Sequence, residues 1–425
     1  MKKKIQTIDE KKFFKLPLEK GTFCLSKEIL NAHSKFGKLI DYFQVETTEL
    51  SFRNEILTLS VKLPGEPKKL VYLKVTEKEL LVSCSFDTDF SYLSRYVYIA
   101  LREFMGISGK AYFDKYYWPD FFDPKTGRSK YLQIINDRRG FDIKLKSKYP
   151  SFYKPGYPLL ELQDDLEIPK DEIQPRSLAE NLPITDKAIG FALADTILSS
   201  FHSNHYPFLV PLHGVTSKDR EKIKTFATFH LNEDDGNELV LSQDQKELSK
   251  ICFKMRELAP VSNSSWDDTF VPTSEELEKG KQLFKLWHQA YKLLLTQKYV
   301  YFFHTRGLKY VKGKPMRSWM RPCEFKKETP ELVIKRMDKG DYFQIELAFR
   351  IKRKLNRLHY PNLTFFLRPE TNWLEEYLLG SFNDWLVVSF FEKTKYKLAV
   401  LKSHYKGDFE DFINQLAERY EVIDS

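Results

Sequence analysis

The fold is decided by residues 79–105, which read ELLVSCSFDTDFSYLSRYVYIALREFM. Residues 80–82 are strand formers, and the residues just upstream, 69–75, alternate between apolar and polar side chains with a period of two. The polar residues 76–78 between these stretches have the length of a hairpin turn. We therefore predict that residues 69–75 and 79–85 form an antiparallel pair.

An amphipathic helix is expected directly after the second strand. Residues 87–89, Asp-Thr-Asp, offer N-terminal caps, and apolar side chains recur at helical spacing from residue 90 to residue 104. Gly106 ends the helix, and Cys84 marks the join between strand and helix. The rest of the chain repeats packing of this kind, so we predict a multi-domain α+β protein with antiparallel sheets and packed helices.

The spacing around Cys84 resembles that of a SWIM-type zinc finger, which places C-x-C at the end of such a hairpin and C-x-H at the start of the next helix. The corresponding positions are Cys84, Phe86, Ser94 and Tyr96. Only Cys84 keeps the side chain of a zinc ligand. The resemblance implies a SWIM-like module over residues 69–105 that has lost its metal, so we predict neither a metal nor a cofactor. The alternative is an ordinary hairpin and helix with a small buried cysteine.

The order of segments in the C-terminal half resembles the region before the ATPase core of bacterial Swi/Snf-type DNA translocases. These segments are residues 299–304, 321–323, 341–349, 385–391 and 409–423. The sequence contains no G-x-x-x-x-G-K-[ST] loop and no acidic helicase box after a strand. The resemblance therefore implies an accessory region without its motor, and a separate ATPase motor or another protein is an expected partner.

Length and composition indicate more than one domain. The chain has 425 residues, of which 42% are hydrophobic and 15% aromatic, which is enough apolar material for real cores. Residues 163–183 are rich in acids and proline, a composition typical of a linker. We predict an N-terminal α+β domain over residues 1–162 and a C-terminal α+β domain, with a mainly antiparallel sheet, over residues 184–425.

Several element predictions in the C-terminal part bear on function. The capping box at residues 273–276, Thr-Ser-Glu-Glu, predicts a helix that continues to about residue 296. Residues 299–304 are expected to form a buried strand. We assign residues 385–391 to a strand that extends the antiparallel sheet predicted for residues 333–334 and 343–349. Residues 187–205 fit a helix or a buried strand.

Cysteine usage and hydropathy point to the cytoplasm. The four cysteines, Cys24, Cys84, Cys252 and Cys323, are widely separated and form no C-x-x-C motif, so reduced thiols are expected. The first residues carry charge with no apolar run after it, and no stretch of 18 uncharged apolar residues occurs. We therefore expect neither a signal peptide nor a membrane partner.

The formal net charge of +9 is concentrated in three runs. Residues 306–327 contain eight Lys or Arg against one acid, with aromatic residues interleaved, and further runs lie at residues 350–357 and 125–154. Cations can neutralise phosphates, and aromatic rings can stack on bases. The candidate nucleic-acid-binding residues are Arg306, Lys312, Lys314, Arg317, Trp319, Arg321, Lys352, Arg353 and Lys354. The alternative is a solvated surface, or an edge strand protected by charge.

Two constellations could carry metal chemistry. His202, His205 and His213 are close in sequence, but no carboxylate or cysteine with ligand spacing follows them, so a histidine-rich loop is an open alternative to a metal site. Asp341 and Glu346 could serve a nuclease, yet their odd spacing on one strand would point them to opposite faces. We assign no catalytic residue.

The sequence favours a non-catalytic accessory protein that binds DNA, weakly and without sequence preference, or a DNA-acting partner such as a Swi/Snf-type motor. The alternative is a metal-dependent nuclease of a mobile-element or defence system. A structural scaffold is a third hypothesis.

Overall fold

The chain folds into two compact units, each made of helices and strands, which confirms the predicted multi-domain α+β class. The computed structural model describes residues 12–19, 21–36, 45–86, 91–137, 140–162, 174–176, 185–195, 205–261, 273–304, 308–358, 364–370, 372 and 374–424. Unit 1 comprises residues 1–159, 337–344 and 398–414, and unit 2 comprises residues 160–336, 345–397 and 415–425.

The division differs from the predicted domains in one respect. We expected residues 184–425 to form one continuous domain, whereas two of their segments, 337–344 and 398–414, belong to unit 1. Most of the predicted linker, residues 163–183, lies outside the described residues, but Arg176 donates its backbone N–H to the carbonyl oxygen of Lys292 in unit 2. The change in composition at residues 163–183 indicates where the chain leaves unit 1. It gives no sign that two later segments of the chain fold back into that unit.

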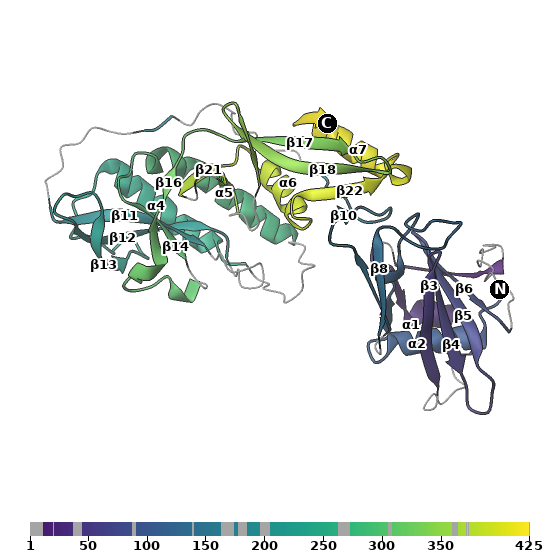
Figure 1. Ribbon diagram of the computed structural model, residues 1–425. Helices are drawn as coiled ribbons and strands as arrows, with labels where there is room; N and C mark the ends of the chain where they lie inside the picture. Colours follow the sequence, from purple (N-terminus) through teal and green to yellow (C-terminus); the bar gives the residue numbers. More distant parts are fainter. Residues whose placement is uncertain are drawn as a thin grey trace. The chain divides into compact units, whose positions relative to one another are not determined.

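Unit 1 is built on a five-stranded antiparallel sheet with the order β1-β6-β5-β4-β3. Its strands are β1 (Phe14–Pro17), β3 (Glu46–Arg53), β4 (Ile56–Lys62), β5 (Lys69–Val75) and β6 (Glu79–Cys84), and its helices are α1 (Lys27–Ala32) and α2 (Arg95–Met105). Alternate apolar residues of β5 and β6 pack with α2 in one hydrophobic core. Figure 1 shows strands β3 to β6 and helix α2 in purple and blue.

The hairpin that decides the fold is confirmed, and the start of its helix is corrected. Strands β5 and β6 pair in antiparallel register, Val71 opposite Cys84. The helix begins at Arg95 with Ser94 as its N-cap residue. The predicted caps at residues 87–89 lie outside the described residues. The helical periodicity before residue 95 reflects apolar side chains such as Leu93, which is buried although it precedes the helix.

The aromatic-rich residues 112–122 serve the core of unit 1. Phe113, Tyr116, Tyr117 and Phe121 are buried. They belong to the same core as the sheet and α2. Large rings bury more apolar area than any other side chain, which explains why so short a segment holds so many of them.

Smaller elements complete unit 1. Strands β2 (Cys24–Ser26) and β7 (Lys110–Tyr112) pair in antiparallel fashion, as do β8 (Leu132–Asp137) and β9 (Gly140–Leu145). Strand β10 (Ser151–Phe152) pairs in parallel with β22 (Lys397–Leu401), which explains how a late segment of the chain joins this unit. Helix α7 (Asp408–Ala417) follows β22 along the chain.

Unit 2 contains a second five-stranded sheet, with the order β13-β12-β11-β14-β15. The strands are β11 (Lys187–Asp195), β12 (Phe208–Thr216), β13 (Ile223–Phe229), β14 (Val300–His304) and β15 (Met320–Pro322). Helices α4 (Gln243–Leu258) and α5 (Ser274–Leu294) pack against each other, and α4 also packs against β12 (Figure 1). The predicted capping box is present at the start of α5, where Thr273 and Glu276 cap each other's backbone N–H groups. Strand β11 resolves the ambiguity for residues 187–195, and residues 196–204 lie outside the described residues.

The remaining elements, which lie wholly or mostly in unit 2, include both parallel and antiparallel pairs. They are β16 (Glu324–Phe325), β17 (Glu331–Asp338), β18 (Tyr342–Ile351), β19 (Lys354–Arg357), β20 (Phe366–Leu367), β21 (Glu375–Leu378), α6 (Phe382–Glu392) and β23 (Glu421–Asp424). The small sheet β16-β21-β20 lies next to α5, whose Tyr291 hydroxyl donates to the carbonyl oxygens of Lys326 and Glu376. The pairs β11–β14, β16–β21 and β17–β23 are parallel.

The assignment of residues 385–391 to a strand was wrong. These residues lie in α6, which begins after Ser381. Ser381 and Asp384 form a capping box in which each side chain accepts a hydrogen bond from the other's backbone N–H group. Because the segment is apolar on nearly all sides, its periodicity does not distinguish a helix from a strand, whereas the capping box does.

No helix in the described part of the chain is both long enough and apolar enough to cross a membrane.

Candidate nucleic-acid interface

The basic stretch of unit 2 connects two neighbouring strands. It leaves β14 at His304 and returns through β15, whose Arg321 lies directly opposite Phe302 in antiparallel register. Strand β15 is at the edge of the five-stranded sheet, so its cation also protects that edge, as the alternative hypothesis required. Arg306, one of the predicted binding residues, lies outside the described residues.

The loop between these strands is anchored by its apolar residues and its backbone. Val311 and Pro315 are buried. The carbonyl oxygen of Gly313 accepts hydrogen bonds from the backbone N–H of Phe229 (2.9 Å) and from the hydroxyl of Thr228 (3.2 Å), at the end of β13. The loop is thus held against the sheet, and the side chains between the anchors face solvent.

Four cations of the loop are free to meet an external anion. Lys312, Lys314, Arg317 and Arg321 are exposed, and within the described part of the chain no carboxylate lies within salt-bridge distance of any of them. Four like charges in so short a stretch repel one another unless an anion neutralises them.

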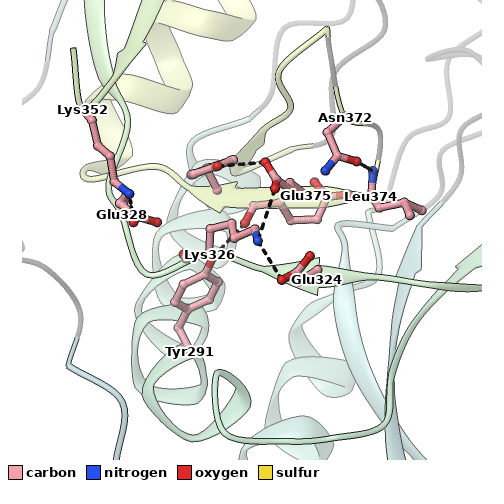
Figure 2. Close-up of polar contacts among 10 residues, drawn as sticks. Tyr291, Glu324, Lys326, Glu328, Lys352, Asn372, Leu374 and Glu375 are labelled. Atoms are coloured by element: carbon pink, nitrogen blue, oxygen red, sulfur yellow. Dashed lines mark hydrogen bonds and ion pairs between the residues drawn. The ribbon is translucent and has the colours of Figure 1, made fainter. Parts of the chain in front are cut away.

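Lys326, near the end of the same basic stretch, is in a different state. Lys326 Nζ lies 2.7 Å from Glu324 Oε1 and 3.2 Å from Glu375 Oε1, as Figure 2 shows. Its charge is used within the fold. The free cations therefore end at Arg321, five residues before Lys326, and this boundary was not visible in the sequence.

Aromatic side chains lie among the free cations. Tyr310 is exposed and meets Trp319 edge to face, with ring centroids 5.6 Å apart. Trp319 is half-buried and is backed by Phe303 at 6.0 Å. The Lys309 ammonium lies 5.1 Å from the centroid of the Tyr310 ring. An exposed ring supported from behind is suited to stack on an unpaired base.

The second predicted run contributes two of its three residues. Lys352 forms an ion pair with Glu328 at 2.8 Å, so it is not a free cation (Figure 2). Arg353, in the turn after β18, and Lys354, the first residue of β19, are exposed and have no carboxylate partner among the described residues. The role of Lys352 in binding nucleic acid stays a prediction.

The third run, in unit 1, is used mainly for internal contacts. Lys130 pairs with Asp341, and Lys144 with Asp142 at 2.7 Å. Lys154 is surrounded by aromatic rings. The three basic runs, which look equivalent in the sequence, therefore differ in the structure, and the strongest case for an interface is the loop between β14 and β15.

One group of polar residues near this loop was not foreseen. Arg368 follows β20 and binds Glu376 on β21 through both Nε and Nη2, while its guanidinium carbon lies 5.0 Å from the centroid of the Phe302 ring. The imidazole of His304 lies 4.5 Å from the same ring. Sequence reasoning missed this group because its members come from three separate segments and form no motif.

Burial and charge shift the pKa values in this group. Burial, together with the positive charges of Arg321 and Arg368, lowers the pKa of the His304 imidazole to about 4, so the ring is neutral near pH 7. Burial raises the pKa of the Glu376 carboxyl group to about 7, although Arg368 opposes the rise. The Oε2 atom of Glu376 is buried without a hydrogen-bond partner.

The four SWIM-like positions lie around the hairpin end and the start of α2. Cys84 is fully buried, Ser94 caps α2, and the rings of Phe86 and Tyr96 meet edge to face with centroids 5.9 Å apart. The aromatic pair thus stands where the resemblance places two zinc ligands. Among the described residues no group of three or more His, Cys, Asp or Glu could hold a metal ion.

The structure describes two of the three histidines that the sequence left open as a loop or a metal site. His202 lies outside the described residues. His205 is buried and donates from Nδ1 to the carbonyl oxygen of Tyr206 at 2.8 Å. His213 lies in strand β12, not in a loop, and its partner is His230. The sequence spacing of residues 202, 205 and 213 therefore did not predict the contact between His213 and His230.

The two carboxylates of the nuclease hypothesis each have a cationic neighbour. Asp341 pairs with Lys130, whereas Glu346 is buried and lies 3.8 Å from the Nε atom of Arg357. Neither arrangement gives two carboxylates that could share a metal ion.

Comparison with protein-family models, with curated proteins and with solved structures found no match for this chain.

Proposed function

We propose that this chain is a non-catalytic accessory protein that binds nucleic acid without sequence preference, through the loop between β14 and β15. The observation that carries the proposal is the group of four exposed cations, Lys312, Lys314, Arg317 and Arg321, which have no carboxylate partner in the described part of the chain. Contacts between such cations and phosphates release counterions, which is the main source of non-specific affinity for nucleic acid.

Tyr310 and Trp319 refine the proposal. A single strand exposes base faces that can stack on a ring, whereas a duplex keeps its bases stacked on one another. The edge-to-face pair beside the free cations therefore favours single strands. A separate motor protein as partner, and a cytoplasmic location, belong to the same proposal; the first rests on the resemblance to Swi/Snf-type translocases, the second on four free cysteines.

The test is a titration of fluorescently labelled single-stranded DNA at several salt concentrations. The variant replaces Lys312, Lys314, Arg317 and Arg321 by Ser together. Each lost phosphate contact should make the slope of log affinity against log salt shallower by about 0.7 for a single strand, so a loss approaching about 3 is expected. The melting temperature should hardly move, because none of the four side chains forms an ion pair with another described residue.

A matched variant controls for net charge. Arg176, Lys187, Lys279 and Lys298 are also in unit 2, but each lies within 4.0 Å of a carboxylate. Their joint replacement by Ser removes the same formal charge and should leave the salt slope near that of the parent. Absence of binding in the parent, or equal slopes in the parent and the loop variant, would refute the proposal.

A further inference from the structure

Nitrogen-bearing side chains from three separate segments come together near Phe302, and two of them contact its ring. His304 lies two residues along β14, so its imidazole is on the same face of the sheet, with ring centroids 4.5 Å apart. Arg321 is the cross-strand partner of Phe302 on β15 and therefore projects from that face too. Arg368 approaches from the segment after β20, with its guanidinium carbon 5.0 Å from the ring centroid.

The charges of this group do not balance. Two arginines contribute two positive charges, while His304 is neutral near pH 7. Within the described part of the chain, the one carboxylate bound to either arginine is that of Glu376. Burial raises its pKa to about 7, so the site carries a net positive charge near neutral pH.

The acids nearby bind neither arginine within the described part of the chain. Glu324 and Glu375 both contact the ammonium group of Lys326 (Figure 2). Arg321 is exposed, and Arg368 is partly so, so their positive charges create a local potential that attracts an external anion.

We infer that His304, Arg321 and Arg368 form a binding site for the terminal phosphate of a nucleic-acid strand, an inference that rests on the proposed function. Arginine offers planar, two-pronged donors that match phosphate oxygens, and the imidazole adds a further donor. The free cations of the loop, which begins directly after His304, hold the following phosphates of the same strand.

The accessibility of Arg368 favours a strand end over an internal phosphate. Only 17% of its side chain is exposed, because it lies against Phe302 and Glu376. An internal phosphate would require the nucleic-acid backbone both to enter this partly buried site and to leave it again. The terminal phosphate of a strand requires only that the strand enter. A terminal phosphate also carries about −1.5 to −2 charges at pH 7 and three acceptor oxygens, which suits two arginines better than the single charge of a phosphodiester.

The experiment compares three internally labelled single strands of one sequence, with a 5′-phosphate, with a 3′-phosphate, or with hydroxyl groups at both ends. The parent protein should bind at least one phosphorylated strand about tenfold more tightly than the hydroxyl strand, which is the effect of one additional charge-assisted contact. Inorganic phosphate at increasing concentration should remove this preference at constant ionic strength, and should leave the affinity for the hydroxyl strand unchanged.

Variants separate the site from the loop. In Arg368→Gln/Glu376→Gln a neutral pair replaces the buried ion pair, which avoids an unpaired buried charge, and the preference should fall to about one. Arg321→Gln should also lower it. Glu376→Gln alone removes the carboxylate that competes with phosphate for Arg368, so the preference should persist or increase, which a merely structural role would not produce. Arg317→Gln should weaken the binding of all strands by a similar factor.

The outcomes distinguish this inference from the proposed function. If the parent binds none of the three strands, the proposed function fails and this inference fails with it. If the parent binds all three equally, the terminal phosphate site is refuted, while sequence-independent binding through the loop stands. A preference that survives in a folded Arg368→Gln/Glu376→Gln variant would place the phosphate elsewhere and would also refute the site.

Discussion

The Nδ1 atom of His213 lies 2.7 Å from the Nε2 atom of His230, and both rings are buried in unit 2. The two residues come from β12 and from the end of β13, which are neighbouring strands. A hydrogen bond between two imidazoles requires that one nitrogen carries a proton and the other does not. The pair is therefore satisfied only while at least one ring is neutral.

We expect this pair to make unit 2 less stable in mild acid. Burial lowers the pKa of both imidazoles. At His213 the positive charge of Lys187 lowers the pKa further, and at His230 that of His213 does the same. The carboxylate of Glu238 opposes the shift at both rings. As the pH falls below 6.5, the unfolded chain takes up protons first, so the free energy of unfolding decreases.

Urea unfolding of the parent and of a His213→Gln/His230→Gln variant, from neutral pH to about pH 5, measures this contribution. Other buried histidines titrate in both proteins and cancel in the comparison. The free energy of unfolding should fall less steeply in the variant. Parallel curves would show that the pair is not a source of acid sensitivity.

A second prediction concerns zinc. Because Phe86, Ser94 and Tyr96 occupy three of the four SWIM-like positions, packing of the aromatic pair should hold the hairpin to α2 without a metal ion. Elemental analysis of protein purified without chelators should find far less than one zinc per chain. One zinc per chain that disappears in Cys84→Ser would contradict the prediction.

A third prediction concerns catalysis. With Asp341 beside Lys130 and Glu346 beside Arg357, we expect no cleavage of DNA in magnesium or manganese, and no hydrolysis of ATP. Gel assays on single-stranded and duplex DNA, together with phosphate release from ATP, provide the measurement. Cleavage that is lost in both Asp341→Asn and Glu346→Gln would instead support the nuclease alternative.

Local signals in the sequence predicted the local parts of the fold. The alternation in residues 69–75 and the capping box at Thr273 each lie within a few residues, and the corresponding hairpin and helix α5 are present. The parallel pair β11–β14 joins strands between which β12, β13, α4 and α5 lie along the chain, and no neighbouring residues specify that pairing. For the same reason the sequence could not predict that residues 398–414 belong to unit 1.

In the candidate site, too, the sequence predicted local features and not contacts between distant residues. The density of charge in the sequence correctly marked Lys312 and Arg317 as exposed cations. It could not show that Lys352 is paired with Glu328, or that Arg368 and Glu376 meet at Phe302. Whether a cation is free depends on carboxylates that lie far away in sequence, so composition predicts the charge of a surface and not its availability.

A fourth prediction tests the local signal that was overlooked. The hydroxyl oxygen of Ser381 accepts a hydrogen bond from the backbone N–H of Asp384 at 3.0 Å at the start of α6. Ser381→Ala should lower the free energy of unfolding by about 1 kcal/mol, whereas Ser381→Asp, which keeps an acceptor, should recover most of it. Equal losses in both variants would mean that the cap does not stabilise α6.

Lys154 provides the last prediction, because aromatic rings and not a carboxylate surround its ammonium group. The Nζ atom lies 4.3 Å from the centroid of Trp118, 4.8 Å from that of Tyr157 and 5.7 Å from that of Tyr117, and it donates to the carbonyl oxygen of Tyr117 at 2.9 Å. Burial lowers its pKa to about 8, although Asp114 opposes the shift. The charged form is therefore less stable in the fold than in water.

Above pH 8 the folded chain loses the Lys154 proton before the unfolded chain does, so the free energy of unfolding should increase with pH until the unfolded lysine titrates. The expected gain between neutral pH and about pH 9.5 is about 2 kcal/mol. The tyrosines Tyr117 and Tyr157, whose pKa values are raised by burial, act in the opposite direction only above pH 10. Lys154→Met should abolish the rise, whereas Lys148→Met, which removes an exposed lysine of the same segment, should retain it. A rise of equal size in the Lys154→Met protein would show that the charge of Lys154 is tolerated in its aromatic surroundings without cost.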